Sequence, residues 1–302
     1  MTRRVLVTGG GGFVGAPAVT ELGQRGFEVH VAARHQGANP TAREWHVLDL
    51  LDGASLDALI KSVAPTHLLH LAWCTEHGAF WDDPANDAWV EATARLAGAF
   101  REAGGQRIVV AGSCAQYGWD GDSLGPDGFA SERDTPRRPA TRYGVAKETV
   151  ARGLDRSAAM GLVFFPYGPN EQPGRLVPTV TRSLLEGTPA PISSGMQVRD
   201  FLHVADCGAA FAALLDSDVT GPVNVGSGTG TSVLEVVQAI ARSLDREDLL
   251  RVGALPDRPA DPPRLVADVT RLHEEVGFEP RFTLESGLTA AVDWWRQRIR
   301  RR

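Results

Sequence analysis

The first part of the chain alternates between two hydrophobic periods. Short apolar runs typical of strands occur at 5–7, 28–33, 45–48, 67–71 and 108–111. Between these runs, apolar residues recur every three or four positions, as they do on the buried face of a helix. Strand and helix alternating five times within about 110 residues predict an α/β fold with a doubly wound parallel sheet.

The pattern changes after residue 165. Glycine and proline recur through 166–196, Arg199 to Leu215 read as a short strand leading into a helix, and short α and β segments follow residue 221. We therefore expect a sheet domain formed by 1–165 and about 197–220. A smaller mixed α/β lobe is expected from 166–196 and 221–302.

A glycine-rich turn follows the first apolar run. Gly9, Gly12 and Gly15 have the spacing G-x-x-G-x-x-G and precede a helix-like segment. Glycine permits a positive φ and a close approach to a ligand, and the helix that follows directs free N–H groups at a phosphate. Strand-to-helix turns also use glycine without any ligand, so the spacing alone leaves a purely structural role open.

Several polar residues fall where predicted strands end. They are Arg34 after Ala33, Asp49, His70 in the stretch that continues to Trp73, and Ser113. In doubly wound sheets, ligands bind outside the carboxyl ends of the strands, where the strand order reverses. Because the glycine turn falls at the same edge, we expect one ligand site there.

Tyr143 and Lys147 stand four apart on a predicted helix and therefore share a face. The chain has only three tyrosines, and Lys61 is its only other lysine. A phenol with a pKa near 10 is a poor acid or base at neutral pH, and a nearby ammonium lowers that pKa. Ser113 is a candidate donor to a reacting oxygen. Alternatively, Tyr143 and Lys147 are an incidental pair on a surface helix, and Ser113 is a serine in a turn without a catalytic role.

Composition excludes several classes of protein. The 302 residues carry a formal charge of −6, which argues against a nucleic-acid-binding surface. No 18-residue apolar run or signal pattern precedes the first strand, so we expect no membrane contact and a cytoplasmic protein. Cys74, Cys114 and Cys207 lack metal-ligand spacing, so no metal site is expected. Cys114 is either a thiol nucleophile or, as is commoner, a small buried residue.

Six motifs occur in a characteristic order: TGGGGFVG, SCAQYG, the Tyr143-x-x-x-Lys147 pair, FFPYGPNEQPGRLVP, RDFLHV and NVGSG. The chain thereby resembles, over essentially its whole length, the extended short-chain dehydrogenase/reductase family of nucleotide-sugar epimerases, dehydratases and ketoreductases. The resemblance implies a Rossmann domain that binds NAD(P) and a C-terminal lobe that binds a nucleoside diphosphate sugar. It also implies a homodimer built on the helices at 84–103 and 142–156.

The resemblance implies roles for individual residues. Tyr143 would be the catalytic acid/base, Lys147 would hold the nicotinamide ribose and lower the pKa of Tyr143, and Ser113 would bind the reacting sugar oxygen. Besides Tyr143 and Lys147, the implied cofactor contacts are Gly9, Gly12, Phe13, Val14, Gly15, Arg34, Asp49, Leu50, Leu71, Ala72, Trp73, Pro166 and Tyr167. The implied substrate contacts are Cys114, Ala115, Asn170, Arg175, Leu176, Val177, Arg199 and Arg258, the last two clamping the pyrophosphate.

Three departures from the family pattern refine these expectations. NAD-using members usually end the second strand with Asp, whereas Ala33-Arg34 favours a 2′-phosphate. We therefore expect NADP(H), with NAD as the alternative if Arg34 is only a solvated loop residue. Sugar dehydratases carry Asp-Glu after the serine or threonine, so Cys114-Ala115 disfavours water elimination. Trp89 replaces a frequent asparagine, which leaves the role of that asparagine in doubt.

The expected reaction follows from the cofactor. Ketoreductases and epimerases share the Ser-Tyr-Lys machinery, but a reductase consumes exchangeable NADPH whereas an epimerase retains NAD⁺. The segments AGSCAQYGW and FFPYGPNEQPGRLVP also resemble deoxysugar-pathway reductases. We expect NADPH-dependent reduction of the C4 ketone of a nucleoside-diphosphate 4-keto-6-deoxyhexose, with an NAD-dependent 4-epimerase as the alternative. A non-catalytic NADP-sensing protein is disfavoured because Ser113, Tyr143 and Lys147 are all present.

Overall fold

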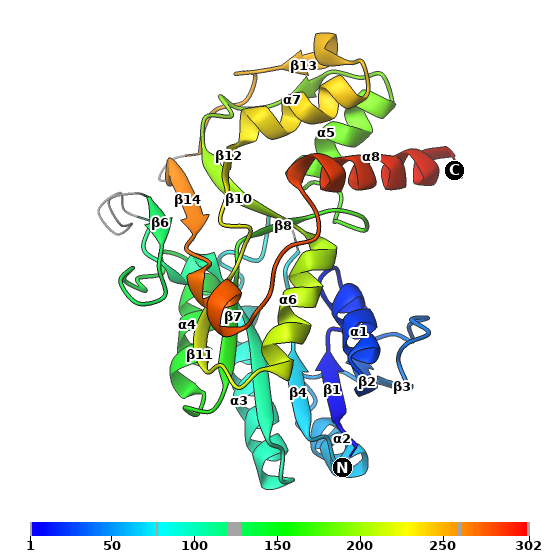
Figure 1. Cartoon of the computed structure of the whole chain (residues 1–302), viewed down its shortest axis with the longest axis vertical. Coiled ribbons are helices and arrows are strands. Elements are labelled where there is room, and N and C mark those ends of the chain that lie inside the picture. The colour runs from blue at the N-terminus through cyan, green and yellow to red at the C-terminus, as the bar shows by residue number, and fades with distance from the viewer. Residues whose placement is uncertain (1, 77, 120–127, 259–260, 301–302) are drawn as a thin grey trace.

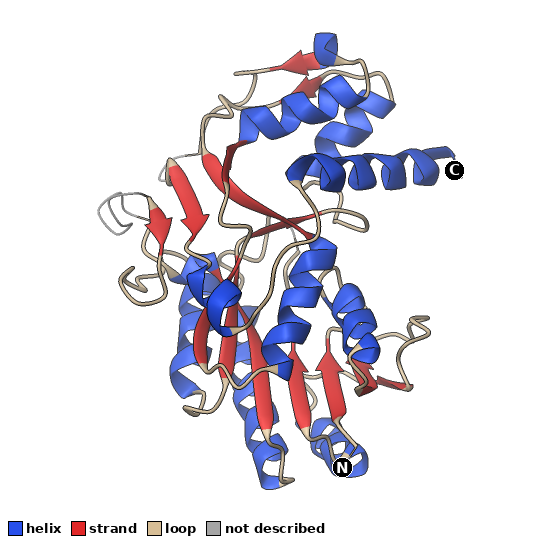
Figure 2. Ribbon diagram, viewed as in Figure 1, coloured by secondary structure: helices blue, strands red, loops and turns tan. Residues whose placement is uncertain are grey.

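The computed structural model describes residues 2–76, 78–119, 128–258 and 261–300. A large parallel sheet carries helices on both faces, and a smaller unit of strands and helices lies beyond the ends to which β1 and β4 point (Figures 1 and 2). None of the described helices combines the length and the apolar character needed to cross a bilayer.

The large sheet has seven strands, and every pairing in it is parallel. In spatial order they are β11 (Gly221–Val225), β7 (Ala159–Val163), β5 (Arg107–Ser113), β4 (His67–His70), β1 (Arg4–Thr8), β2 (Glu28–Ala33) and β3 (Glu44–Val47). The strand order reverses at β1, since the chain moves from β1 outward to β3 and then returns to β4. The Rossmann-type doubly wound sheet predicted from the hydrophobic pattern is confirmed.

Alternate residues of the inner strands fill two separate cores. Val5, Val7 and Val31 face helices α1 (Gly15–Gln24) and α6 (Val204–Asp216). Leu6 and Ala32 face the opposite core, to which α2 (Gly53–Val63), α3 (Ala85–Glu102) and α4 (Arg142–Gly153) contribute. Burial on both faces explains why these strands read as continuous apolar runs. Figure 1 shows α1 and α6 in front of the sheet.

The smaller unit is organised around β10 (Val198–His203). This strand pairs with β8 (Phe165–Tyr167), β12 (Gly230–Ser232) and β14 (Arg264–Ala267), and β14 pairs with β6 (Phe129–Ala130). Helices α5 (Leu176–Leu185), α7 (Val233–Ser243) and α8 (Leu284–Arg300) enclose a third core. The remaining elements are β9 (Ala190–Pro191), β13 (Leu250–Arg251) and the single turns Cys114–Gln116, Glu247–Leu249 and Arg271–Glu275.

The expected division of the chain differs from the strand pairing at three places. β11, expected in the C-terminal lobe, pairs with β7 in the large sheet. β10 and β6, both expected in the sheet domain, belong to the small sheet, in which β10 is the central strand and β6 pairs with β14. The apolar run at 162–165 is shared by two strands, because β7 ends at Val163 and β8 begins at Phe165. Strand pairing is set by contacts far apart in sequence, which local periodicity does not report.

Candidate active site

The glycine turn after β1 is tightly packed. Gly9 has φ +72°, and its N–H donates to Ala32 O over 3.2 Å, while the N–H of Gly12 donates to Gly9 O over 2.9 Å. A Cβ on Gly9 would lie 2.8 Å from Ala72 N, and one on Gly15 would collide with Gly9 O. Any side chain at these two positions would therefore displace the backbone.

The turn leaves the start of α1 available to an anion. The N-cap residue Val14 supplies no side-chain hydrogen bond to the first helical turn, and Gly11 and Gly12 are exposed. Free N–H groups and the helix dipole favour a phosphate at such a position. The residues present therefore fit the pyrophosphate of a dinucleotide.

The predicted cofactor residues of neighbouring strands lie around this turn. Leu71 N and Ala72 N donate to Thr8 at 3.2 and 3.3 Å, so the segment after β4 packs against the turn. Arg34 is exposed directly after β2, which the Gly9–Ala32 hydrogen bond ties to the turn. After β3, Asp49 is exposed and Leu50 is buried.

Tyr143 is enclosed by aromatic rings at the start of α4. Thr141 caps this helix by accepting from Gly144 N at 3.1 Å, and Tyr143 N donates to Trp81 O at 2.9 Å. Phe80 and Trp81 contact the tyrosine ring edge-on, with centroids 4.9 and 5.9 Å away. Burial raises the pKa of Tyr143 to about 12, against the opposing effects of the nearby Ser113 hydroxyl and the charge of Arg175. The phenol is therefore protonated at neutral pH.

Lys147 lies one turn further along α4, fully inside the protein. Its Nζ donates to Ala111 O at 2.8 Å and lies 3.6 Å from the centre of the Trp73 ring. Burial lowers its pKa well below the usual range. The expected lowering of the pKa of Tyr143 by Lys147 is not seen here, because burial dominates and the ammonium is directed at the carbonyl and the indole face.

Ser113 is fixed at the end of β5 by a reciprocal cap. Its Oγ accepts from Ala115 N at 3.2 Å, and its N–H donates to Gln116 Oε1 at 3.0 Å. Gln116 in turn donates to Glu148 on α4 at 3.1 Å, which couples the strand end to the helix that carries Tyr143. The structure thus places Ser113, Tyr143 and Lys147 near one another.

Cys114 and Ala115, predicted to contact substrate, are both buried beside Ser113. Burial raises the pKa of the Cys114 thiol to about 12, so it stays protonated at neutral pH. Since the thiolate is the reactive form, this favours a packing role over a nucleophilic one. A substrate contact at these two positions stays a prediction.

Asn86 orders the aromatic loop ahead of α3. Its side chain accepts from Trp73 Nε1 and donates to Phe80 O and Asp83 O, each at 2.8 Å. Trp73 also stacks on Trp89, with centroids 5.9 Å apart. Trp89 therefore packs against Trp73, the residue whose ring contacts Lys147.

The predicted substrate segment before α5 lies near Tyr143. Arg175 is the N-cap of α5, with its guanidinium 5.6 Å from the centre of the Phe80 ring. Leu176 and Val177 begin the helix, and Asn170 is exposed with φ +68°. Of this group, Arg175 affects Tyr143, because its charge opposes the burial-induced rise in the pKa of that phenol.

Other predicted contacts have partners inside the protein. Arg199 is 4% exposed and pairs with Asp261 at 2.6 Å. Arg258, three residues before Asp261 in the chain, is exposed. Tyr167, next to Pro166 in β8, is buried in the core of the smaller unit and donates to Leu284 O at 3.2 Å. The pyrophosphate clamp and the cofactor contact of Tyr167 thus stay predictions.

Glu171 is a buried carboxyl group near this site that sequence reasoning did not single out. It is 8% exposed, and its Oε2 has no hydrogen-bond partner among the described residues. Burial raises its pKa to about 8, although the charge of Arg175 opposes this shift. The local sequence PNEQP does not indicate that Glu171 is buried, because this burial depends on how the segment packs against the rest of the protein.

Glu171→Gln should alter the pH dependence of stability. The folded-state pKa of Glu171 lies above its unfolded value, so its contribution to stability is full below about pH 4.5 and is lost as pH rises towards about 8. Relative to wild type, the variant should gain about 3 kcal/mol of unfolding free energy between pH 5 and pH 8. Urea unfolding at both pH values measures this. Exposed Glu91→Gln should show no such change; a matching result for both variants would refute the assignment.

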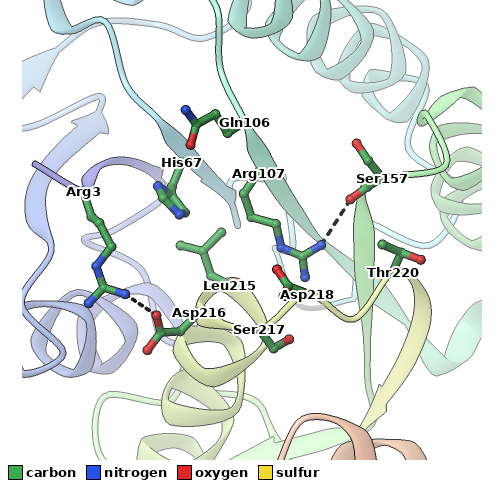
Figure 3. A pocket seen from close by; sticks show the side chains of 10 residues that line it. All are labelled: Arg3, His67, Gln106, Arg107, Ser157, Leu215, Asp216, Ser217, Asp218 and Thr220. Atoms are coloured by element: carbon green, nitrogen blue, oxygen red, sulfur yellow. Dashed lines mark hydrogen bonds and ion pairs between the residues drawn. The ribbon is translucent and has the colours of Figure 1, made fainter. Parts of the chain in front are cut away.

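A polar cavity at the opposite edge of the sheet is distinct from this site. It has a volume of about 350 Å³ and is lined by the starts of β1, β4 and β5 together with residues 215–220 (Figure 3). Arg107 there donates to Ser157 O at 3.1 Å and to Leu214 O at 2.8 Å, and Arg3 pairs with Asp216. Arg3 is thus paired with a carboxylate, and the two terminal nitrogens of Arg107 donate to backbone carbonyls, whereas Arg107 Nε has no hydrogen-bond partner among the described residues.

Comparisons with known proteins agree with this geometry. The profile of the NAD dependent epimerase/dehydratase family matches residues 5–226. A dTDP-glucose 4,6-dehydratase of Xanthomonas campestris is 29% identical, covering 96% of this chain and 92% of that protein. A UDP-glucose 4-epimerase of Mycolicibacterium smegmatis is 30% identical, covering 98% and 99%, respectively.

A solved structure of similar fold contains ligands. MoeE5 in complex with UDP-glucuronic acid and NAD has a TM-score of 0.82 and 31% identity, covering 98% of this chain and 99% of that one. The family profile, the sheet topology and the grouping of Ser113, Tyr143 and Lys147 lead to one conclusion. This chain belongs to the NAD-dependent epimerase/dehydratase family, within the extended short-chain dehydrogenases/reductases.

Proposed function

We propose that the protein catalyses NADPH-dependent reduction of the C4 ketone of a nucleoside-diphosphate 4-keto-6-deoxyhexose. The observation that carries this proposal is that β2 ends with Ala33 and is followed directly by Arg34, beside the glycine turn. An exposed guanidinium there complements a 2′-phosphate, whereas an aspartate would accept from a ribose hydroxyl. NADPH is typically the exchangeable reductant of such a reaction.

Different residues of the chain would bind different parts of the cofactor. The glycine turn and the start of α1 would hold the pyrophosphate, and Arg34 the 2′-phosphate. Asp49 and Leu50 would border the adenine, and the segment after β4 together with Lys147 would border the nicotinamide ribose. For this contact Lys147 would turn its Nζ from the Trp73 face towards the ribose hydroxyls.

Tyr143 would supply the proton of the reduction. When bound at the glycine turn, the dinucleotide would supply the hydride that the ketone carbon accepts. Because burial raises the pKa of Tyr143 to about 12, its phenol carries the proton that the carbonyl oxygen takes up as negative charge develops. Ser113 would donate a hydrogen bond to the same oxygen, and Lys147 would stabilise the resulting phenolate until solvent reprotonates it.

This site lacks the residues that water elimination requires. A dehydratase needs an acid and a base beside the reacting sugar, yet Ser113 is followed by a neutral buried thiol and a methyl group. Reduction requires only one proton donor and one hydrogen-bond donor. We therefore favour reduction over dehydration, even though several relatives are dehydratases.

Arg34→Ala should weaken NADPH binding by about 10- to 100-fold, since one charged hydrogen-bonding contact contributes roughly 1.5–3 kcal/mol. NADH affinity should change less than threefold because NADH lacks the 2′-phosphate. Titration of both dinucleotides by fluorescence measures the two affinities. Arg156→Ala, which removes an exposed arginine after α4, should change neither. Equal losses for both dinucleotides in Arg34→Ala would contradict the proposed contact.

An NAD-dependent 4-epimerase is the second candidate. It is favoured by the 30% identity to the Mycolicibacterium smegmatis UDP-glucose 4-epimerase and by the NAD in the MoeE5 complex. An epimerase returns its hydride to the same substrate and retains NAD⁺. The dinucleotide that co-purifies separates the candidates: stoichiometric NAD⁺ supports the epimerase, whereas an empty or NADP-exchangeable site supports the reductase.

A further inference from the structure

Two histidines and a glutamate meet on β2 and the edge strand β3. The strands pair in parallel, with His30 opposite Glu44 and Ala32 opposite His46, so the three side chains lie on one face of the sheet. Fifteen residues separate the two histidines in sequence, and only this register joins them. The lack of metal-ligand spacing among the cysteines therefore does not bear on this cluster of two histidines and a glutamate.

The donor atoms of this cluster have the separation that a bound ion requires. His30 Nδ1 and His46 Nε2 are 3.0 Å apart, and Glu44 Oε2 lies 3.8 and 3.9 Å from them. One point can lie about 2.1 Å from all three atoms, which matches Zn–N and Zn–O bonds. The histidine side chains are 10% and 17% exposed, whereas Glu44 is 60% exposed and open to solvent.

A second carboxylate orients His30 for this role. Glu28 Oε1 lies 3.1 Å from His30 Nε2 and is itself held by Arg4 Nε at 2.7 Å. With its Nε2 proton directed at Glu28, the neutral ring presents a lone pair on Nδ1. A carboxylate–histidine pair of this kind is the usual outer contact of a metal-bound imidazole.

We propose that His30, Glu44 and His46 bind one divalent transition-metal ion, of which Zn²⁺ suits the donor set best, with water completing the coordination. Two imidazoles and a carboxylate favour such an ion over Mg²⁺ or Ca²⁺. The site lies at the β3 edge of the sheet, whereas Ser113 ends β5 on the other side of β1. It goes beyond the proposed reaction and would fasten the edge strand to β2.

Metal binding by the full-length, tag-free protein tests this proposal. After dialysis against a chelator, Co²⁺ should bind with a stoichiometry of one, give visible absorption bands, and be displaced by Zn²⁺. His30→Gln and His46→Gln should each weaken binding at least tenfold. Glu28→Gln should weaken it about 10- to 100-fold through His30. Exposed His35→Gln is the matched control and should bind like wild type.

Two results would contradict the proposed metal site. Absence of binding below millimolar Co²⁺ and Zn²⁺ would show that the histidines share only a hydrogen bond and would overturn the proposal. Unchanged binding in the His30→Gln, His46→Gln double variant would do the same. Circular dichroism confirms folding of each variant, and Glu44→Gln, at an exposed side chain, gives a milder test if a histidine variant fails to fold. None of these readouts depends on catalytic turnover.

Discussion

Tyr143→Phe is expected to lower turnover of a keto sugar nucleotide by about 10²- to 10⁴-fold, the usual contribution of a positioned acid. Affinity for NADPH should stay almost unchanged, because the phenylalanine ring keeps the edge-on contacts with Phe80 and Trp81. Only the hydroxyl beside Ser113 is lost. Steady-state kinetics together with a separate NADPH titration measure the two quantities.

Tyr117→Phe is the matched control for this experiment. Tyr117 is fully buried, and its hydroxyl donates to Asn224 Oδ1 at 2.8 Å, so the variant should lose about 1 kcal/mol of unfolding free energy. Its turnover should stay within a fewfold of wild type. If Tyr143→Phe retained the wild-type rate, another group would have to supply the proton.

Gly15→Ala should have the largest effect on cofactor binding. The added Cβ would collide with Gly9 O and lie 2.8 Å from Gly10 Cα, so the turn would have to shift. A shifted turn loses charge-assisted hydrogen bonds to the pyrophosphate, each contributing roughly 1.5–3 kcal/mol. We expect NADPH affinity to fall by about 100-fold or more, measured by calorimetry on variant protein that circular dichroism shows to be folded.

Gly98→Ala provides the contrast. Gly98 is exposed on α3, and a Cβ there would meet no atom within 4 Å. The change should raise stability by about 0.5–1 kcal/mol through helix propensity and leave cofactor binding unaltered. Wild-type affinity in Gly15→Ala would show that the turn does not hold the dinucleotide.

Local patterns in the sequence predicted the elements of the large sheet well. The runs at 5–7 and 28–33 are two of its strands, and Tyr143 and Lys147 share a face of α4. These features follow from periods of two and 3.6 residues, which belong to short stretches of chain. The glycine turn was predicted on the same grounds, since its spacing is itself local.

Features that depend on long-range packing could not be predicted. The placement of β11 and β10 in opposite sheets depends on which strands meet, and the meeting of His30 with His46 depends on one register. The direction of Lys147 Nζ towards Ala111 O and Trp73 is likewise set by the aromatic loop. Burial of Glu171 also comes from tertiary packing.

Deuterium transfer tests the central claim most directly. The protein would be incubated with a nucleoside-diphosphate 4-keto-6-deoxyhexose and NADPH deuterated at the transferable position of the nicotinamide. The proposed reaction predicts one NADP⁺ formed for each sugar reduced and deuterium at C4 of the product sugar, detected by NMR and mass spectrometry. Absence of NADPH oxidation, with or without interconversion of C4 epimers of a nucleotide sugar, would contradict it.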